Sequence, residues 1–168
     1  MKFKYNLIAF FVIGILGAIS HFVYEWSGEN QILGYFFAVN ESTWEHLKLL
    51  FFPTVVFSFI EYIFVKKEVK NYVPSVVISL IVGILSIIVL FYSYKGFLGY
   101  GVDFINILIY YISVIIMLIV KNKIIDSEKF ESSSSSLFFL FLGFLITLLF
   151  IFFTYNPPTL AVFKPPQK

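Results

Sequence analysis

The sequence predicts an all-α protein, a polytopic membrane bundle of five transmembrane helices. The chain of 168 residues has a mean hydropathy of +0.92 and only 13% charged residues, which leaves too few polar groups to cover the outside of a soluble domain. Several apolar runs approach the roughly 20 residues with which a helix crosses the hydrocarbon core, and they lack the period-2 alternation of a membrane β-barrel. A soluble core of this size is not a competitive interpretation.

The five spans form a single transmembrane domain that covers residues 1–168. We predict them at residues 5–24, 47–65, 73–94, 104–120 and 137–155. Residues 126–136 end in the low-complexity run "ESSSSS" and are predicted to form a flexible cytoplasmic linker. Pro53 lies inside the second span, where its ring is expected to kink the helix and to free the carbonyl of Leu49.

The positions of the lysines predict the orientation, because all twelve basic residues are lysines. One set of span ends carries eight of them: Lys2, Lys4, Lys66, Lys67, Lys70, Lys121, Lys123 and Lys129. The other set carries four: Lys48, Lys95, Lys164 and Lys168. The excess favours the first set in the cytoplasm, with the N-terminus inside and the C-terminus outside. We therefore expect a multi-pass protein of the plasma membrane.

Composition also limits the classes of binding partner that we expect. The net charge of +2 is small and scattered, so nucleic-acid binding is not expected. The lipid bilayer is the predicted partner, and nothing in the sequence identifies a protein partner or an oligomer. An alternative for the N-terminus is a signal peptide, because Lys2 and Lys4 precede an apolar run that ends in Ala18-Ile19-Ser20. Cleavage there would leave four spans and a chain that starts at His21.

Polar residues gather at the span ends predicted to lie outside. His21 and Glu25 are spaced i, i+4 at the end of the first span, and so share one helical face. The start of the second span has two more such pairs, Glu41 with Glu45 and Ser42 with His46, and Asp103 opens the fourth span. Between the first two spans, residues 32–39 are apolar but too short to cross, so they are expected to hold the acidic segment close to the bundle.

Two interpretations of these residues stay open. Ser42 and Glu45 match a capping box at the start of a helix, and the whole set can be a hydrogen-bonded cluster that binds a ligand or partner or ties helix ends together. Alternatively, His21, Glu25 and His46 hold a metal ion, with zinc as the default. Glu41 or Glu45 would then be the general base of a membrane-embedded hydrolase or transferase acting on a lipid or envelope substrate, and Asp103 would orient a ligating histidine. We favour binding or structure, because no catalytic motif is present.

Charge is absent from the middle of every predicted span, which disfavours ion-coupled transport. Glu61 lies about one turn from the cytoplasmic end of the second span, and its carboxylate is expected to extend toward Lys66 or Lys67.

Three stretches carry a resemblance: "HFVYEWSG" (21–28), "VNESTWEHLKLLFFP" (39–53) and "FTYNPPTLAVFKPP" (153–166). The Asn-Glu-Ser-x-Trp-Glu-His-x-Lys string within the second is the specific part. The chain resembles a family of small, multi-span bacterial membrane proteins that is classified only as a domain of unknown function. The marked positions that this resemblance implies are His21, Tyr24, Glu25, Ser27, Asn40, Glu41, Ser42, Trp44, Glu45, His46 and Lys48. The resemblance implies no established activity.

Overall fold

The protein is all-α. The computed structural model describes residues 2–65, 68–127 and 129–165, and over these residues it contains helices and no strand. The helices are α1 (Lys2–Trp26), α2 (Gln31–Gly34), α3 (Thr43–Val65), α4 (Tyr72–Leu98), α5 (Asp103–Asp126), α6 (Ser133–Tyr155) and the short 3-10 helix η1 (Ala161–Phe163). Five of them, all except α2 and η1, are long and apolar enough to cross a membrane, as the composition predicted.

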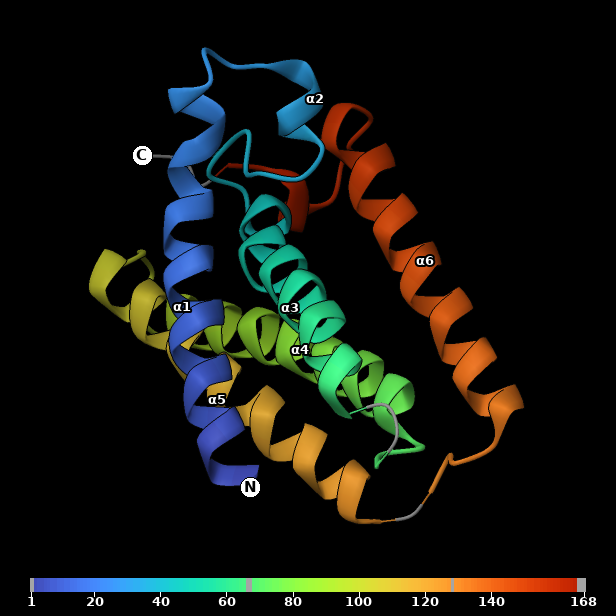
Figure 1. Cartoon of the computed structure of the whole chain (residues 1–168). Coiled ribbons are helices and arrows are strands. Elements are labelled where there is room, and N and C mark those ends of the chain that lie inside the picture. Colours follow the sequence, from blue (N-terminus) through green and yellow to red (C-terminus); the bar gives the residue numbers. More distant parts are fainter. Residues whose placement is uncertain (1, 66–67, 128, 166–168) are drawn as a thin grey trace.

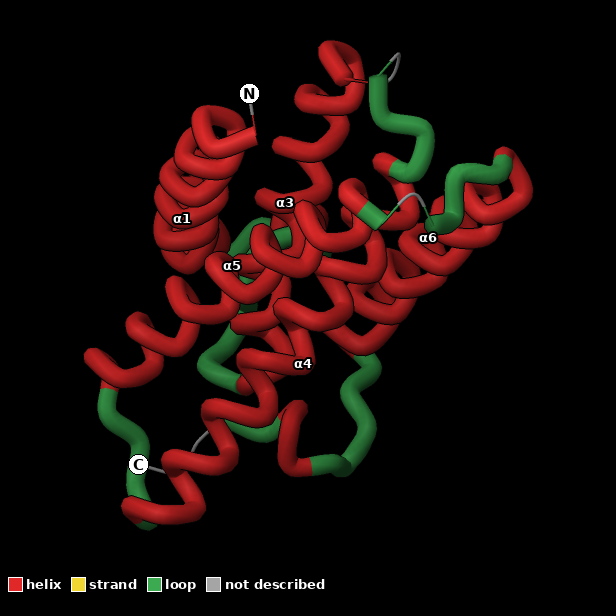
Figure 2. Tube along the Cα trace, turned by 90° about the horizontal axis from the view of Figure 1, so that it is seen from below, coloured by secondary structure: helices red, strands yellow, loops and turns green. Residues whose placement is uncertain are grey.

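The five long helices form a bundle with α3 near its middle. In Figure 1 and, from below, in Figure 2, α1 and α6 lie on opposite sides of the bundle with α3 between them. Helix α3 packs against α1, α4 and η1, and α4 packs closely against α5 and α6. Half of the most apolar window of α3 is buried, against 11% of that of α6. The rest of the protein therefore leaves most of the surface of α6 uncovered.

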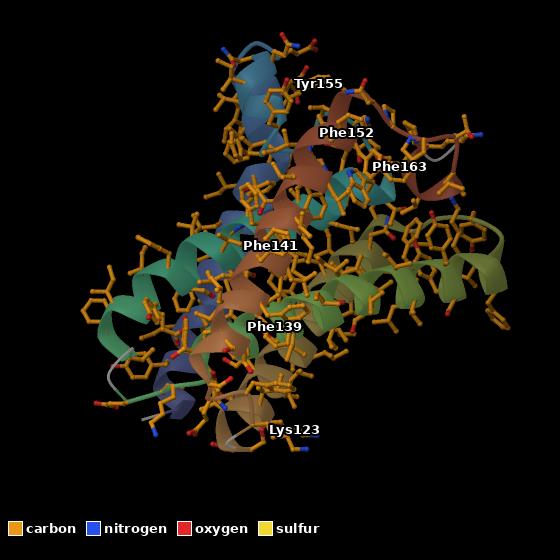
Figure 3. All side chains as sticks on the ribbon, turned by 90° about the vertical axis from the view of Figure 1, so that its right-hand side faces the viewer. Lys123, Phe139, Phe141, Phe152, Tyr155 and Phe163 are labelled. Atoms are coloured by element: carbon orange, nitrogen blue, oxygen red, sulfur yellow. The ribbon has the colours of Figure 1, made fainter. Side chains whose placement is uncertain are left out.

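The ends of α1, α3 and α6 gather in two groups, whereas the turn between α4 and α5 lies apart from both (Figure 1). One group contains the end of α1, the short helix α2, the start of α3 and the end of α6. The other contains the start of α1, the end of α3 and the end of α5. Figure 3 shows the same division, with Tyr155 and Phe163 at one end and Lys123 at the other. We call these the α2 end and the Lys123 end.

The helices are longer than the predicted spans where polar residues are satisfied within the fold. Helix α5 continues from the predicted limit at residue 120 to Asp126, because Lys121 pairs with a carboxylate of α3 instead of ending the helix. Helix α6 begins inside the serine run, at Ser133. Ser132 caps it, since its hydroxyl oxygen accepts the N–H of Ser135 at 3.1 Å. The part of the predicted linker that stays outside helices is correspondingly short.

Candidate metal centre

The start of α3 is fixed by side chains of the segment that precedes it. The Asn40 side-chain oxygen accepts the N–H of Ser42 at 2.8 Å, and the Ser42 hydroxyl accepts the N–H of Glu45 at 3.4 Å. These two bonds satisfy donors that a helix start leaves free. Only the serine half of the predicted capping box is formed. The Glu45 carboxylate does not return to Ser42, because it accepts the N–H of Val39 at 3.1 Å instead.

Two histidines and a glutamate meet at the α2 end, one from each of three segments. His21 lies in the last turns of α1, His46 in the first turn of α3, and Glu41 in the loop between them. Glu41 Oε2 lies 3.7 Å from His21 Nε2 and 3.4 Å from His46 Nε2, and the two imidazole centroids are 5.2 Å apart. One ligand atom from each residue lies within 4.8 Å of the other two. We call these three residues the His/Glu group.

The His/Glu group is open to the surroundings on one side. The side chains of His21 and His46 are 31% and 32% exposed, and that of Glu41 is 64% exposed. A small ion or molecule can therefore reach the group without any rearrangement of the helices.

The protonation of His46 follows from its hydrogen bond. Its Nδ1 lies 2.9 Å from the carbonyl oxygen of Ser42, and a carbonyl oxygen only accepts hydrogen bonds. Nδ1 must therefore carry a proton, and in the neutral ring the lone pair lies on Nε2. That lone pair faces Glu41 Oε2 at 3.4 Å, so two electron-rich atoms point at each other. A proton or a metal cation between them removes this repulsion.

The second histidine is held differently. His21 Nδ1 is enclosed by the protein and has no hydrogen-bond partner among the described residues. Its Nε2 is the nitrogen that faces Glu41. Both imidazoles thus turn the same type of nitrogen toward one carboxylate oxygen, as ligands around a common ion would.

A fully buried lysine holds the loop that carries Glu41. Lys48 Nζ is 0% exposed and lies 2.6 Å from Glu45 Oε2. The same ammonium donates to the Gly34 carbonyl at 2.9 Å, the Phe37 carbonyl at 3.3 Å and the Thr154 hydroxyl at 2.7 Å. These bonds connect α2, the loop after it, α3 and α6. We call this set of contacts the Lys48 clamp.

The structure separates the residues that the sequence proposed as one site. Glu25 is exposed, and it is not part of the His/Glu group. The Glu45 carboxylate is buried against Lys48, and Asp103 is an exposed residue in the first turn of α5. Glu41, proposed as a base, is the third member of the His/Glu group.

Sequence reasoning did not find the role of Lys48, which was counted as an outer lysine and marked by the family resemblance without a role. A lysine among apolar residues inside a helix that continues into a membrane span is itself an indication of internal partners. Its hydroxyl partner Thr154 is 106 residues away in sequence, so spacing could not have identified it.

Comparison with known proteins places the chain in a family. The model of the family of unknown function DUF6512 matches residues 1–167. The chain belongs to this family. No curated protein and no solved structure matches the chain. The membership agrees with the resemblance to a domain of unknown function, and DUF6512 carries no activity that could be transferred to the His/Glu group.

Proposed function

We propose that this DUF6512 protein is an integral, multi-pass membrane protein that binds a divalent transition-metal ion, zinc by the chemistry of its ligands, through His21, Glu41 and His46. Two imidazoles and one carboxylate form a donor set that zinc accepts. Zinc binds such atoms at 2.0–2.2 Å, which in a tetrahedron places them about 3.4 Å apart. The distances of 3.4 and 3.7 Å from Glu41 Oε2 to the two histidine nitrogens are close to that value, and all three ligand atoms lie within 4.8 Å of one another.

The observation that carries this proposal is the lone pair of His46 Nε2 facing Glu41. Because Nδ1 donates to the Ser42 carbonyl, the other nitrogen is oriented and left basic, which is how backbone oxygens prepare ligating histidines in metal sites. The competing occupant of the same position is a proton, which would make His46 and Glu41 an ion pair. A measurement of metal content separates the two occupants.

Binding is favoured over hydrolysis. A hydrolase would need a carboxylate near the metal to take a proton from water. Glu45, the sequence-based candidate, has its carboxylate engaged by Lys48 and by the Val39 N–H. Asp103 and Glu25 are not part of the His/Glu group. Glu41, the remaining candidate, is proposed as a metal ligand, so none of these four carboxylates is left as a general base.

Metal content tests the proposal directly. Protein purified in detergent and dialysed against zinc is expected to retain about one zinc ion per chain by mass spectrometry. His21→Ala, His46→Ala and Glu41→Ala are each expected to weaken zinc binding by tenfold or more, because each removes one of three ligands. Zinc should also raise the melting temperature of the wild type and not that of the variants, since a ligand stabilises only the state that binds it.

Glu25→Ala is the matched control, because it removes an exposed glutamate one turn from His21 that is outside the His/Glu group. Its zinc content should equal that of the wild type. If well-folded wild-type protein retains no zinc, a proton and not a metal ion lies between His46 and Glu41. The proposal of a metal site would then be wrong. Loss of zinc in Glu25→Ala but not in Glu41→Ala would restore the ligand set proposed from the sequence.

The orientation is part of the same proposal, with the His/Glu group on the extracytoplasmic face of the plasma membrane. It is supported by the lysine excess at the Lys123 end. The chain has no cysteine, so an introduced thiol is a unique label. Thr159→Cys places an exposed thiol after the end of α6, and Ser134→Cys places one in the first turn of that helix. A membrane-impermeant maleimide should label the first in intact cells and the second only after permeabilisation; the reverse pattern would invert the proposed topology.

A further inference from the structure

A second polar site lies at the Lys123 end, away from the His/Glu group. A cleft of about 670 Å³ opens there between α1, α3, α4 and α5. Its lining residues are Tyr5, Asn6, Glu61, Val65, Glu68, Val69, Tyr72, Lys121, Asn122, Ile125 and Asp126. The volume is in the range of small-ligand sites, which combine apolar walls with a few fixed polar groups.

The floor of the cleft is an ion pair that the sequence did not predict. Glu61 was expected to extend toward Lys66 or Lys67, which lie outside the described residues. Instead its Oε2 pairs with Lys121 of α5 and lies 2.6 Å from the Tyr72 hydroxyl. The side chains of Glu61 and Lys121 are 9% and 7% exposed. The pair is therefore buried in the bundle and still borders the cleft.

The pair leaves hydrogen-bonding capacity unused. Both bonds to Glu61 go to Oε2, and within the described part of the chain no donor bonds to its other oxygen, Oε1. The Lys121 ammonium has three N–H groups, and Glu61 is its one hydrogen-bond partner among those same residues. A ligand that fits this floor must offer a donor to a carboxylate oxygen and an acceptor to an ammonium.

The cleft lies where lipid headgroups would meet the protein. Its lining comes from the first turns of α1 and α4, from the last turns of α3 and α5, and from Glu68 and Val69 between α3 and α4. These four helices are able to cross a membrane. Half-buried Tyr5 borders the cleft, and tyrosine is typical of the headgroup level of membrane proteins. Exposed Glu68 adds a negative charge at the rim.

We infer that this cleft binds a phosphoethanolamine group, a zwitterion with a primary ammonium and a phosphate. The ammonium would donate to Glu61 Oε1 with Glu68 nearby, and a phosphate oxygen would accept from Lys121, which forms charge-assisted bonds with such oxygens. The group can arrive on phosphatidylethanolamine or as the soluble compound. Choline, whose quaternary nitrogen has no N–H, cannot make the bond to Oε1, so the site distinguishes the two headgroups.

Lipid retention measured by native mass spectrometry tests the inference. The full-length protein is released from nanodiscs that contain equal amounts of phosphatidylethanolamine and phosphatidylcholine. We expect one retained phosphatidylethanolamine per chain, preferred over phosphatidylcholine by about tenfold or more, the effect of losing a hydrogen bond to a charged group. Added O-phosphoethanolamine should displace the lipid if the soluble compound is a ligand; failure to displace it would assign the site to the lipid.

Two variants locate the binding. Asn122→Phe fills the cleft with a ring without touching the ion pair, and the double variant Glu61→Leu/Lys121→Met replaces the pair by apolar side chains, a change that buried pairs often tolerate. Both should abolish the preference, whereas Lys95→Met, near the end of α4 and outside the cleft, should keep it. If the double variant does not fold, Asn122→Phe alone decides. Equal retention of both lipids by the wild type, or a preference that survives in Asn122→Phe, would overturn the inference.

Discussion

Replacing Lys48 by methionine is expected to lower the free energy of unfolding by about 3–5 kcal/mol, because it leaves the buried carboxylate of Glu45 without its counter-charge. The substitution also removes the bonds from Nζ to the Gly34 and Phe37 carbonyls and to the Thr154 hydroxyl. The measurement is reversible unfolding in mixed micelles. Zinc binding should weaken in the same variant, since the loop that carries Glu41 loses its connection to α3 and α6.

Two further variants separate the charge from the packing. In Lys48→Met/Glu45→Gln the amide oxygen can still accept the Val39 N–H while the uncompensated charge is gone, so part of the lost stability should return. Lys95→Met removes a lysine that is only half-buried and contacts the ring of Phe91 at 5.5 Å, so it should change stability by less than about 1 kcal/mol. Equal destabilisation by Lys48→Met and Lys95→Met would contradict the Lys48 clamp.

The helices of the fold could be predicted because they depend on local composition. Each predicted span lies within one long helix of the structure, since an apolar run of that length has no other way to satisfy its backbone in a membrane. The ends were less accurate. The fourth span was predicted to end at residue 120, just before Lys121, yet the helix continues because Glu61, 60 residues earlier, neutralises that charge.

Two of the three residues of the His/Glu group could be predicted, because their positions also depend on where the helices begin and end. His21 and His46 could be assigned to facing helix ends from the spans alone. Their third partner could not, because the position of Glu41 depends on how residues 35–42 fold back over α1 and α3. Helical spacing favoured Glu25, four residues from His21, whereas the loop brings Glu41 to 3.7 Å from that histidine. The Lys48 clamp, which fixes the loop, uses the backbone carbonyl groups of Gly34 and Phe37. Every residue has such a group, so the sequence does not indicate which ones will bind the lysine.

Where α1 packs against α3, the carbonyl that Pro53 was predicted to leave free has a partner in another helix. Pro53 lacks the N–H that would bond the Leu49 carbonyl, and the free carbonyl lies 3.2 Å from the Tyr110 hydroxyl of α5. The same hydroxyl lies 2.9 Å from the Ile13 carbonyl of α1. Tyr110 thus reaches between two helices. It can do so because Gly17, which faces it from α1, has no side chain.

Gly17→Ala is accordingly expected to destabilise the protein by about 3 kcal/mol, at the upper end of what overpacking costs. A Cβ at this position would lie 1.9 Å from the Tyr110 hydroxyl oxygen and 2.6 Å from the Leu49 carbonyl oxygen. The tyrosine could rotate away only by giving up its bonds to both helices, and the backbone oxygen could not move without displacing α3. The measurement is again the free energy of unfolding in mixed micelles.

Gly96→Ala is the matched control, because Gly96 lies within α4 and, beyond the adjoining residues and backbone of that helix, no atom of the described residues lies within 4 Å of a Cβ added there. Alanine is the better helix former, so this variant should gain up to about 1 kcal/mol. Adding Tyr110→Phe to Gly17→Ala removes the shortest of three close contacts and leaves those with the Leu49 oxygen at 2.6 Å and with the ring carbon Cζ of residue 110 at 2.7 Å. The double variant should therefore lose less than the two single changes added together. Strictly additive losses would show that Gly17 and Tyr110 do not pack against each other, and the close approach of α1 to α3 would need another cause.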